Sequence, residues 1–253
     1  MIGASVRRIV RRGRKKIAEG SVSVFASDEA PATPRTLSGR AYSHLHDAII
    51  RGRLAPGERL RIEDLALSLK LSPTPIREAL YRLELVGLAN HEPHRGARVT
   101  ELSSADLQEI YEARLALETL AIRKAAEICT PEIADQARDH LRRYVAAQRQ
   151  DSYDESAHKD FHFTLYSASG SRWLVRLITP LWESCERYRH KWVPLKEELR
   201  NRGDEHNAIL DACASRDPDG AVLLLHNHLA RTANFIAMQM SGQAIIPLID
   251  RPA

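Results

Sequence analysis

The sequence predicts a mostly α-helical chain with two folded parts. Apolar residues recur at helical spacing from Leu37 onward, and from Ser103 nearly to the end the pattern is helical with only short breaks. The only extended signals are two short segments, about 88–92 and 97–100, on either side of a turn. We therefore expect a small N-terminal helical unit with a β-hairpin, followed by an all-α helical bundle.

Residues 1–36 predict a basic, disordered tail and linker. Residues 1–40 hold nine Lys and Arg against three acidic residues, and most of these lie in SVRRIVRRGRKKIAEG at 5–20. Residues 21–36 are small, proline-bearing and aperiodic, which is typical of a linker. Residues 101–253 instead carry nineteen basic against twenty-three acidic residues. This gradient indicates a polyanionic partner for the front of the chain only.

Two helices precede the most informative stretch of sequence. Apolar spacings of three and four predict a first helix from near Leu37 to RGRLAPGERL, where Pro56-Gly57 makes a turn. A short second helix follows, with Leu65 and Leu69 on its apolar side.

The stretch LKLSPTPIREALYRLELVGLAN, residues 69–90, places two prolines at the start of a third helix. If Ser72 is the N-cap, Pro73 and Pro75 fall at the first and third helical positions. Backbone N–H groups there have no partner within the helix, so proline loses nothing, and its fixed φ favours the first turn. Gly87 suits the C-terminal end.

The third helix has a buried and an outward face. At about 100° per residue, one stripe is apolar: Ile76, Ala79, Leu80, Leu83 and Val86. Thr74, Arg77 and Tyr81 project from the opposite side, starting at the N-terminus, where free N–H groups and positive partial charge favour anions. Taken alone, this pattern also describes a solvated helix face.

The predicted hairpin has a basic turn at His94-Arg95-Gly96. A short helix, a tight turn, an outward-facing helix and a basic hairpin together predict a winged helix-turn-helix that binds double-stranded DNA. We assign residues 37–100 to this domain.

Residues 101–245 predict an all-α domain of six helices, with residues 246–253 as a C-terminal tail. The expected breaks are Thr130-Pro131, Gln150–Ser152, Ser169–Ser171, Val193-Pro194 and Arg216–Pro218.

Four histidines lie within apolar stripes of three of these helices: His158, His162, His206 and His228. Each could be a hydrogen-bonded core residue, because a buried imidazole needs partners for its nitrogens. Converging imidazoles in a helical core are equally suited to a divalent transition metal. Asp160 and His226 lie on other faces of the same helices and are expected not to be ligands.

Arg114 and Glu118 fall in the centre of another buried stripe. They can form a buried ion pair four residues apart. Alternatively, the guanidinium can present a bidentate fork to a carboxylate ligand. A metal beside such an arginine would suit a small organic acid.

Several classes of protein are excluded or made less favourable. No apolar run is long enough for a transmembrane helix, so no membrane partner is expected. Three separated cysteines fit a reducing, cytoplasmic setting. An enzyme that activates water on a histidine-bound metal is a weaker alternative, because no HExxH, GxSxG or phosphate-binding glycine loop is present.

The run from about residue 45 to 100, with SPTPIREAL at its centre and RGARV near its end, resembles the GntR family of bacterial transcription regulators. The resemblance implies DNA contacts from Ser72, Thr74 and Arg77 in the helix and from Arg95 and Gly96 in the wing. Many members have arginine where this chain has Pro73, and some have a basic residue near Glu63. Those two contacts are therefore not expected here.

The helical part resembles the effector-binding FCD domain of the FadR subgroup, through YEARLALE, FHFTLYSASGS, EHNAIL and HNHL. The family binds metal through the pattern D-x-x-x-H, then H, then H, which maps onto His158, His162, His206 and His228. His158 replaces the family's aspartate. The all-imidazole set suits zinc or nickel better than manganese. The family's arginine near the metal corresponds to Arg114.

Together these patterns predict a ligand-responsive transcription regulator, by default a repressor, that binds a palindromic operator as a homodimer. A small carboxylate in the metal-containing helical pocket would shift the protein between two states. The alternative keeps the regulator but has structural histidines and a metal-free effector pocket.

Overall fold

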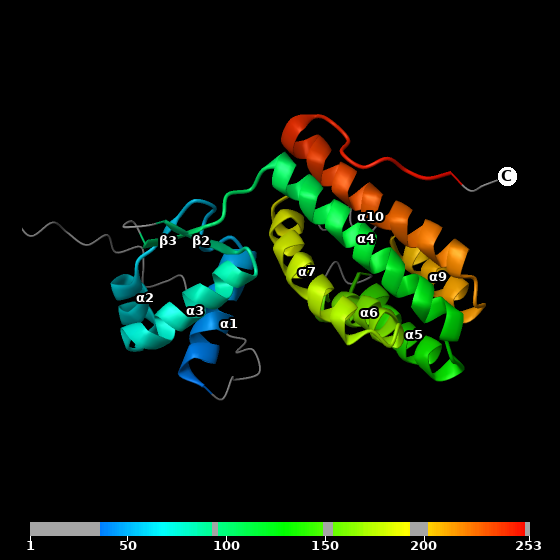
Figure 1. Ribbon diagram of the computed structural model, residues 1–253, viewed down its shortest axis with the longest axis horizontal. Coiled ribbons are helices and arrows are strands. Elements are labelled where there is room, and N and C mark those ends of the chain that lie inside the picture. Colours follow the sequence, from blue (N-terminus) through cyan, green and yellow to red (C-terminus); the bar gives the residue numbers. More distant parts are fainter. Residues whose placement is uncertain (1–35, 93–95, 149–153, 193–201, 251–253) are drawn as a thin grey trace, which may run out of the picture.

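The computed structural model describes residues 36–92, 96–148, 154–192 and 202–250. The described part is mostly helical and forms two units, an N-terminal one with a small sheet and a C-terminal helical bundle (Figure 1). This arrangement confirms the predicted fold class. The expected tail and linker lie, except for residue 36, outside the described residues.

The N-terminal unit, which we call the winged unit, has three helices and three strands. In chain order these are α1 (Leu37–Ile50), β1 (Arg59–Leu60), α2 (Ile62–Leu69), α3 (Pro73–Leu85), β2 (Ala89–Glu92) and β3 (Gly96–Val99). Their apolar side chains form a core of their own, with α1 packed along α3.

Helix α3 begins as the prolines predict, with Pro73 as its first residue and Ser72 as an extended N-cap. The Ser72 side chain makes no capping hydrogen bond. One of its two usual donors, the third helical N–H, is missing because Pro75 occupies that position. Gly87 follows the helix with φ of 73°, a conformation that costs glycine nothing.

The wing contains a strand that the sequence analysis missed. The sheet order is β1-β3-β2, all antiparallel, with Leu60 opposite Ala97 and Glu92 opposite Gly96. Strand β1 has only two residues, too few for an alternating pattern to be visible in the sequence. Its place is fixed by pairing with β3 across the unit.

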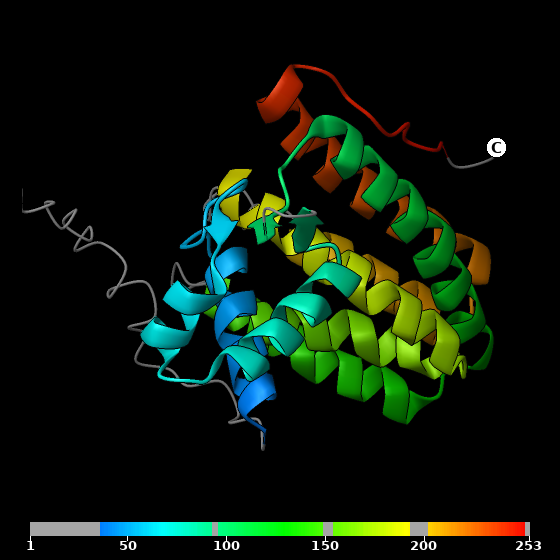
Figure 2. The same cartoon turned by 60° about the vertical axis from the view of Figure 1, so that its left-hand side comes forward.

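The bundle contains the six helices expected from the sequence among the described residues. They are α4 (Ser104–Ile128), α5 (Pro131–Gln148), α6 (Glu155–Ala168), α7 (Arg172–Trp192), α9 (Arg202–Ala214) and α10 (Pro218–Ser241). Helix α4 packs along α10 and α7, and α5 packs along α6 (Figures 1 and 2). No helix in the described ranges has both the length and the apolar character that a membrane span needs.

The segment after α10 folds back on the bundle. The Asn234 side chain accepts from the backbone N–H groups of Ile245 and Ile246, at 2.8 and 2.9 Å, and donates to the Ile246 carbonyl. Ile246 is only 5% exposed and joins the bundle core. The sequence analysis assigns Ile246 to the tail, because these polar contacts leave no periodic pattern.

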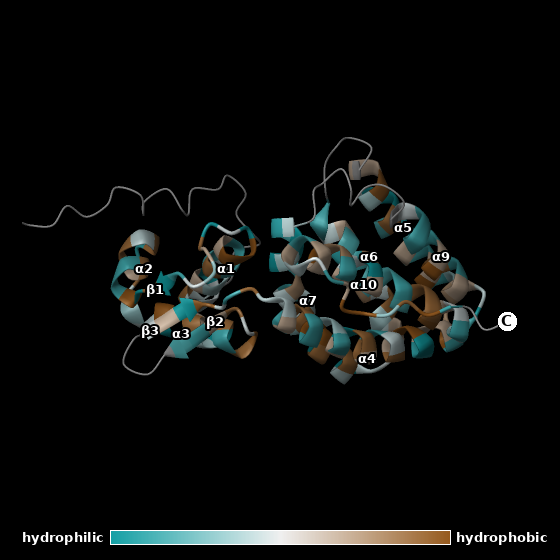
Figure 3. Ribbon diagram, turned by 90° about the horizontal axis from the view of Figure 1, so that it is seen from above, coloured by the Kyte–Doolittle hydropathy of each residue, from teal (hydrophilic) through white to brown (hydrophobic). Residues whose placement is uncertain are grey.

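Helix α7 is the bundle helix that meets the winged unit (Figure 3). The Ser184 hydroxyl donates to the Val86 carbonyl at 2.9 Å, and Arg187 Nη1 donates to the Thr100 carbonyl at 3.1 Å. Glu183 lies 3.5 Å from a ring nitrogen of His46 on α1. One helix therefore carries polar contacts to α1, to the end of α3 and to the connection into the bundle.

A matched pair of serines tests the account of the α3 N-terminus. The Ser103 hydroxyl caps α4 by accepting from the Asp106 N–H at 3.1 Å, whereas Ser72 caps nothing. Ser103→Ala should lower the free energy of unfolding by about 1 kcal/mol, and Ser72→Ala should lower it by clearly less. Urea unfolding of both variants measures the difference; equal losses would contradict the role assigned to Pro75.

Candidate DNA-binding surface and histidine site

The outward face of α3 is open to solvent. Ser72, Thr74 and Arg77 are exposed, and Tyr81 is 62% exposed. A groove of about 380 Å³ runs between α3 and the sheet, and its lining includes Arg77, Tyr81 and Gly96. Arg77 and Tyr81 of α3 and Gly96 at the described end of the wing therefore border one concave surface, whereas Ser72 and Thr74 do not line it. Arg95, predicted at the wing tip, lies outside the described residues.

The structure brings the four predicted histidines together in the bundle core. His158 and His162 come from α6, His206 from α9 and His228 from α10, and each is at most 3% exposed. Each offers one ring nitrogen, and these four nitrogens lie within 4.8 Å of one another. The Nε2 atoms of His162 and His206 are 3.0 Å apart. This spacing lets one divalent ion contact all four rings after small movements.

Two of these imidazoles are oriented by acceptors behind them. His228 Nδ1 lies 2.8 Å from a carboxylate oxygen of Glu205, and His162 Nδ1 lies 3.2 Å from the Tyr166 hydroxyl. Tyr166 donates its own proton to Glu118 at 2.6 Å, so it can only accept from His162. Both histidines therefore carry their proton on Nδ1. Their Nε2 lone pairs are left for the centre of the cluster, as in carboxylate–histidine–metal arrangements.

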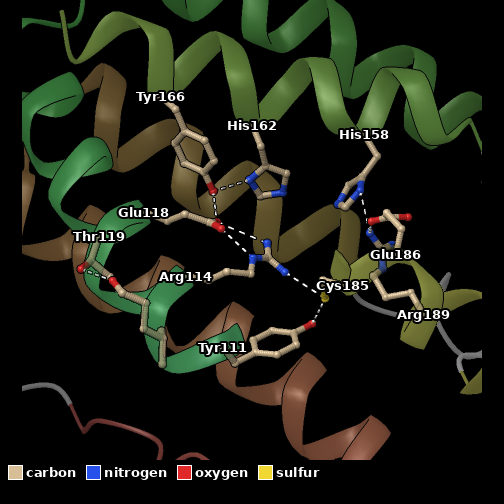
Figure 4. A network of polar contacts seen from close by, with 11 residues as sticks. Tyr111, Arg114, Glu118, Thr119, His158, His162, Tyr166, Cys185, Glu186 and Arg189 are labelled. Atoms are coloured by element: carbon tan, nitrogen blue, oxygen red, sulfur yellow. Dashed lines mark hydrogen bonds and ion pairs between the residues drawn. The ribbon is translucent and has the colours of Figure 1, made fainter. Parts of the chain in front are cut away.

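His158 has a different neighbour. Arg189 Nη1, from α7, lies 3.2 Å from His158 Nδ1 (Figure 4). Since guanidinium only donates, this nitrogen must accept, and the ring proton then sits on Nε2. Metal binding through His158 Nε2 would require loss of that proton. The fourth ligand position, where the family pattern has aspartate, thus lacks the prepared lone pair that His162 and His228 direct at the centre.

Burial favours the neutral form of the two cluster histidines on α6. Burial lowers the pKa of His158 well below its usual range, and the Arg189 charge lowers this pKa further. Burial likewise lowers the pKa of His162, with the neighbouring His206 and His228 adding to the effect. Neutral imidazole is the form that binds metals.

Arg114 and Glu118 form the buried ion pair that was one of the two expectations. Arg114 Nε donates to Glu118 Oε1 at 2.6 Å, and Arg114 also points toward the Cys185 sulfur at 3.2 Å (Figure 4). The space bordered by Arg114, three of the histidines and Trp182 is about 10 Å³, room for roughly one water. An organic acid would therefore need this site to open.

Four further side chains belong to the site but were not identified from the sequence: Tyr166, Trp182, Arg189 and Glu205. Tyr166 follows His162 by four residues, and Trp182 and Arg189 lie two turns apart on one face of α7, so helix-face analysis could have found these three. Glu205 reaches His228 from another helix, and no sequence pattern indicates that pairing.

Asp160 and His226, which share helices with the cluster histidines and were expected not to be ligands, lie apart from the cluster. Asp160 accepts from Ser156, and His226 Nε2 contacts the Pro247 carbonyl at 3.0 Å. Glu155, Glu186 and His190 form a second group with ligand-type atoms within 4.8 Å. In that group Glu186 pairs with Arg189 at 2.8 Å and His190 lies 3.5 Å from Glu155, so its charges already have partners.

Comparison with known protein families gives two matches. Residues 37–99 match the gntR family of bacterial regulatory proteins, and residues 109–231 match the FCD domain. The first match covers the winged unit, and the second covers the helices that hold the histidine cluster.

Individual relatives match most of the chain. The HTH-type transcriptional regulator BphR of Paraburkholderia xenovorans (strain LB400) is 31% identical over 219 residues, which cover 83% of this chain and 89% of BphR. The HTH-type transcriptional repressor GlaR of Escherichia coli (strain K12) is 28% identical, over 79% of this chain and 96% of its own. The solved structure of E. coli McbR/YncC superposes with a TM-score of 0.70 at 25% identity, covering 81% of this chain and 99% of that one.

The lowered histidine pKa values predict a pH dependence of stability. In the unfolded chain histidine titrates near about 6.5, so below that pH the unfolded state binds protons that His158 and His162 exclude when folded. Stability of the metal-free protein should fall as pH falls through about 6.5, by up to about 1.4 kcal/mol per pH unit for each histidine. Urea unfolding in chelator measures this, and a His158→Gln/His162→Gln variant should show a shallower slope. An unchanged slope in that variant would contradict the assignment.

Proposed function

Given that this chain belongs to the GntR family of bacterial transcription regulators and carries an FCD domain, we propose that it is a metal-containing, ligand-responsive repressor. Residues 37–100 would bind the operator, and residues 101–245 would bind the effector and a second subunit. The convergence of four buried histidines in the bundle is the observation that carries the metal and effector part of this proposal.

The DNA-binding role rests on what α3 and the wing leave exposed. The N-terminus of α3 is surrounded by polar side chains and favours phosphate. These are the Ser72 hydroxyl, which makes no capping hydrogen bond, the Thr74 hydroxyl and the Arg77 guanidinium. Tyr81 and Gly96 extend this surface into the groove beside the sheet. Arg77 is the residue best suited to read a base edge, because guanidinium pairs bidentately with guanine.

A homodimer on a palindromic operator follows from symmetry. A single winged unit reads one half-site, and a two-fold dimer reads two. On α7, Trp173 and Leu177 are four residues apart and 68% and 48% exposed. An apolar pair of this kind supports contact with a second copy.

For the metal, the donor set favours zinc or nickel. Three histidines from three helices, His162, His206 and His228, surround the centre, and two of them have acceptors on Nδ1. Neutral nitrogen ligands select borderline metals over manganese. The ion would supply a positive charge and open coordination positions for an anionic effector. The alternative is a metal-free site in which the histidines hydrogen-bond to one another. The short contact between His162 and His206 is the observation that supports this alternative.

A carboxylate effector would exchange partners with Glu118. Arg114 holds that carboxylate now, with Arg189 and Glu186 forming a second pair nearby. A ligand carboxylate that replaced Glu118 on Arg114 would leave the Glu118 carboxylate with Tyr166 as a donor but without its counter-charge, which a metal ion held by the histidines would then have to supply. Because α7 lines this space and also contacts the winged unit, opening here would change how that unit is held.

Arg77→Ala should weaken operator binding by roughly 1–3 kcal/mol, because a bidentate base contact is lost. Fluorescence anisotropy at fixed salt measures the change, with the exposed bundle residue Arg123→Ala as the charge-matched control. Equal affinities for the Arg77 and Arg123 variants would remove Arg77 from the recognition surface.

His206→Ala should remove most of the bound metal, since a first-sphere ligand is lost. Glu205→Gln should keep the ligands but weaken metal affinity by about 10- to 100-fold, because His228 loses its oriented partner. Elemental analysis and chelator competition give the two values. His226→Ala and Asp160→Ala are the controls and should retain metal; loss in these variants with retention in His206→Ala would overturn the ligand assignment.

Replacing Arg114 alone would leave Glu118 as a buried unpaired charge, so paired variants are needed. The double variant Arg114→Gln/Glu118→Gln should fold, bind the operator and no longer respond to a carboxylate effector. Glu118→Gln alone leaves Arg114 without its counter-charge, which a bound carboxylate would supply, so this variant should still respond. Operator release titrated with a panel of small carboxylates compares them; a normal dose-response from the double variant would leave Arg114 with a structural role only.

A further inference from the structure

A second cavity lies between the winged unit and the bundle. Its volume is about 380 Å³, within the range of small-molecule sites, which are frequent at domain boundaries. The winged unit and the connection to α4 contribute Ile49, Ile50, Arg51, Gly52, Leu54, Ala55, Pro56, Val99 and Leu102, and α7 contributes Arg187, His190 and Lys191. None of these residues lines the histidine site.

The wall formed by the winged unit is apolar. Ile49, Ile50, Leu54 and Val99 are each at most 6% exposed and belong to that unit's own core. A ligand held against these side chains would need a hydrocarbon part. A small inorganic anion would leave this wall uncovered.

The opposite wall holds a buried cation with an unusual set of partners. Arg187 is 4% exposed and donates to two carbonyls, that of Thr100 at 3.1 Å and that of Ser184 at 3.4 Å. The other two buried arginines of the bundle, Arg114 and Arg189, each hold a carboxylate, at 2.6 and 2.8 Å. Among the described residues, no carboxylate lies within ion-pair distance of Arg187.

Burying a guanidinium without a counter-charge is costly, and here burial lowers the pKa of Arg187. Tyr188 and Asp106 offset part of this effect, and the Asp106 carboxylate accepts from the Tyr188 hydroxyl at 2.5 Å. The Arg187 guanidinium is therefore buried without a carboxylate ion-pair partner among the described residues.

The rim of the cavity carries three basic side chains, two of which have carboxylate partners. Lys191 is exposed, with its ammonium 4.5 Å from the Trp192 ring. Arg51 pairs with Asp47 at 2.6 Å, and Glu155 raises the pKa of His190 through a hydrogen bond. The site thus offers one buried guanidinium, the exposed ammonium of Lys191 at its entrance and an apolar wall.

We propose that this interdomain cavity binds a small organic carboxylate with a hydrocarbon tail, its carboxylate on Arg187 and its tail against Ile50, Leu54 and Val99. Such a ligand would touch α1 and α7 together and hold the winged unit in one position on the bundle. Its binding is independent of the histidine site. Only its consequence for operator affinity rests on the proposed function.

Octanoate is a suitable probe, with octan-1-ol as its uncharged analogue. Isothermal titration calorimetry on the full chain should give saturable octanoate binding, and octan-1-ol should bind at least about tenfold more weakly, because the charge-assisted contact is missing. Arg187→Gln should weaken octanoate binding by about tenfold or more for the same reason. Ala55→Trp, which fills the cavity from its exposed side without changing Arg187, should do likewise.

Two controls separate this site from others. Arg123→Gln removes an exposed bundle charge and should bind octanoate like the unaltered chain. Arg114→Gln/Glu118→Gln alters the histidine site and should also bind normally. If circular dichroism shows that Arg187→Gln is unfolded, Ala55→Trp and octan-1-ol decide the question.

Absence of saturable binding would overturn the proposal. So would equal affinity in the unaltered chain and Ala55→Trp, or loss of binding only in the histidine-site variant. None of these outcomes would affect operator binding through Arg77, so failure here is distinguishable from failure of the proposed function.

Discussion

Each imidazole buried in the bundle needs a partner for both ring nitrogens, and this requirement organises the centre of the protein. Glu205 and the Tyr166–Glu118 pair accept from Nδ1 of two histidines and so turn their Nε2 lone pairs toward a common point. Because burial lowers the pKa of His162, its Nε2 lone pair is available to a metal or, without one, to a proton shared with His206. The tautomers, and not only the positions, thus determine what the site can bind.

The same constraint links the site to its surrounding charges. Glu118 accepts a hydrogen bond from Tyr166 and also forms an ion pair with Arg114. Arg189 contacts His158 and forms an ion pair with Glu186. A change at one member therefore alters the hydrogen bonding or charge of the next. Polar networks of this kind are sensitive to partial disruption, which would suit the ligand response proposed for this site.

Helix α7 gives this network a connection to the DNA-binding half. Trp182, Cys185 and Arg189 face the histidines and Arg114, whereas Ser184 and Arg187 bond to backbone carbonyls of the winged unit and its connection. A ligand that moves α7 can therefore bias the position of the winged unit through direct contacts. Coupling of this kind requires two arrangements of α7 with different affinities for the ligand.

Local patterns in the sequence were sufficient for much of this. The paired prolines determined where α3 begins, the apolar period determined the six described bundle helices, and helix-face analysis placed four histidines on inward faces while leaving Asp160 and His226 aside. These features depend on residues within one or two turns of each other. Spacing also showed that Arg114 and Glu118 would lie side by side, although not whether Arg114 would be available to a ligand.

Only the tertiary structure decided which groups meet across elements. The two-residue strand β1 exists because β3 lies beside it, Glu205 reaches His228 from another helix, and Arg189 takes the position next to His158. The cavity between the units and the contact of Arg187 with the Thr100 carbonyl depend on how α7 packs against the winged unit. Long-range packing sets these neighbours, and a periodic pattern records which face a residue is on but not what lies opposite that face.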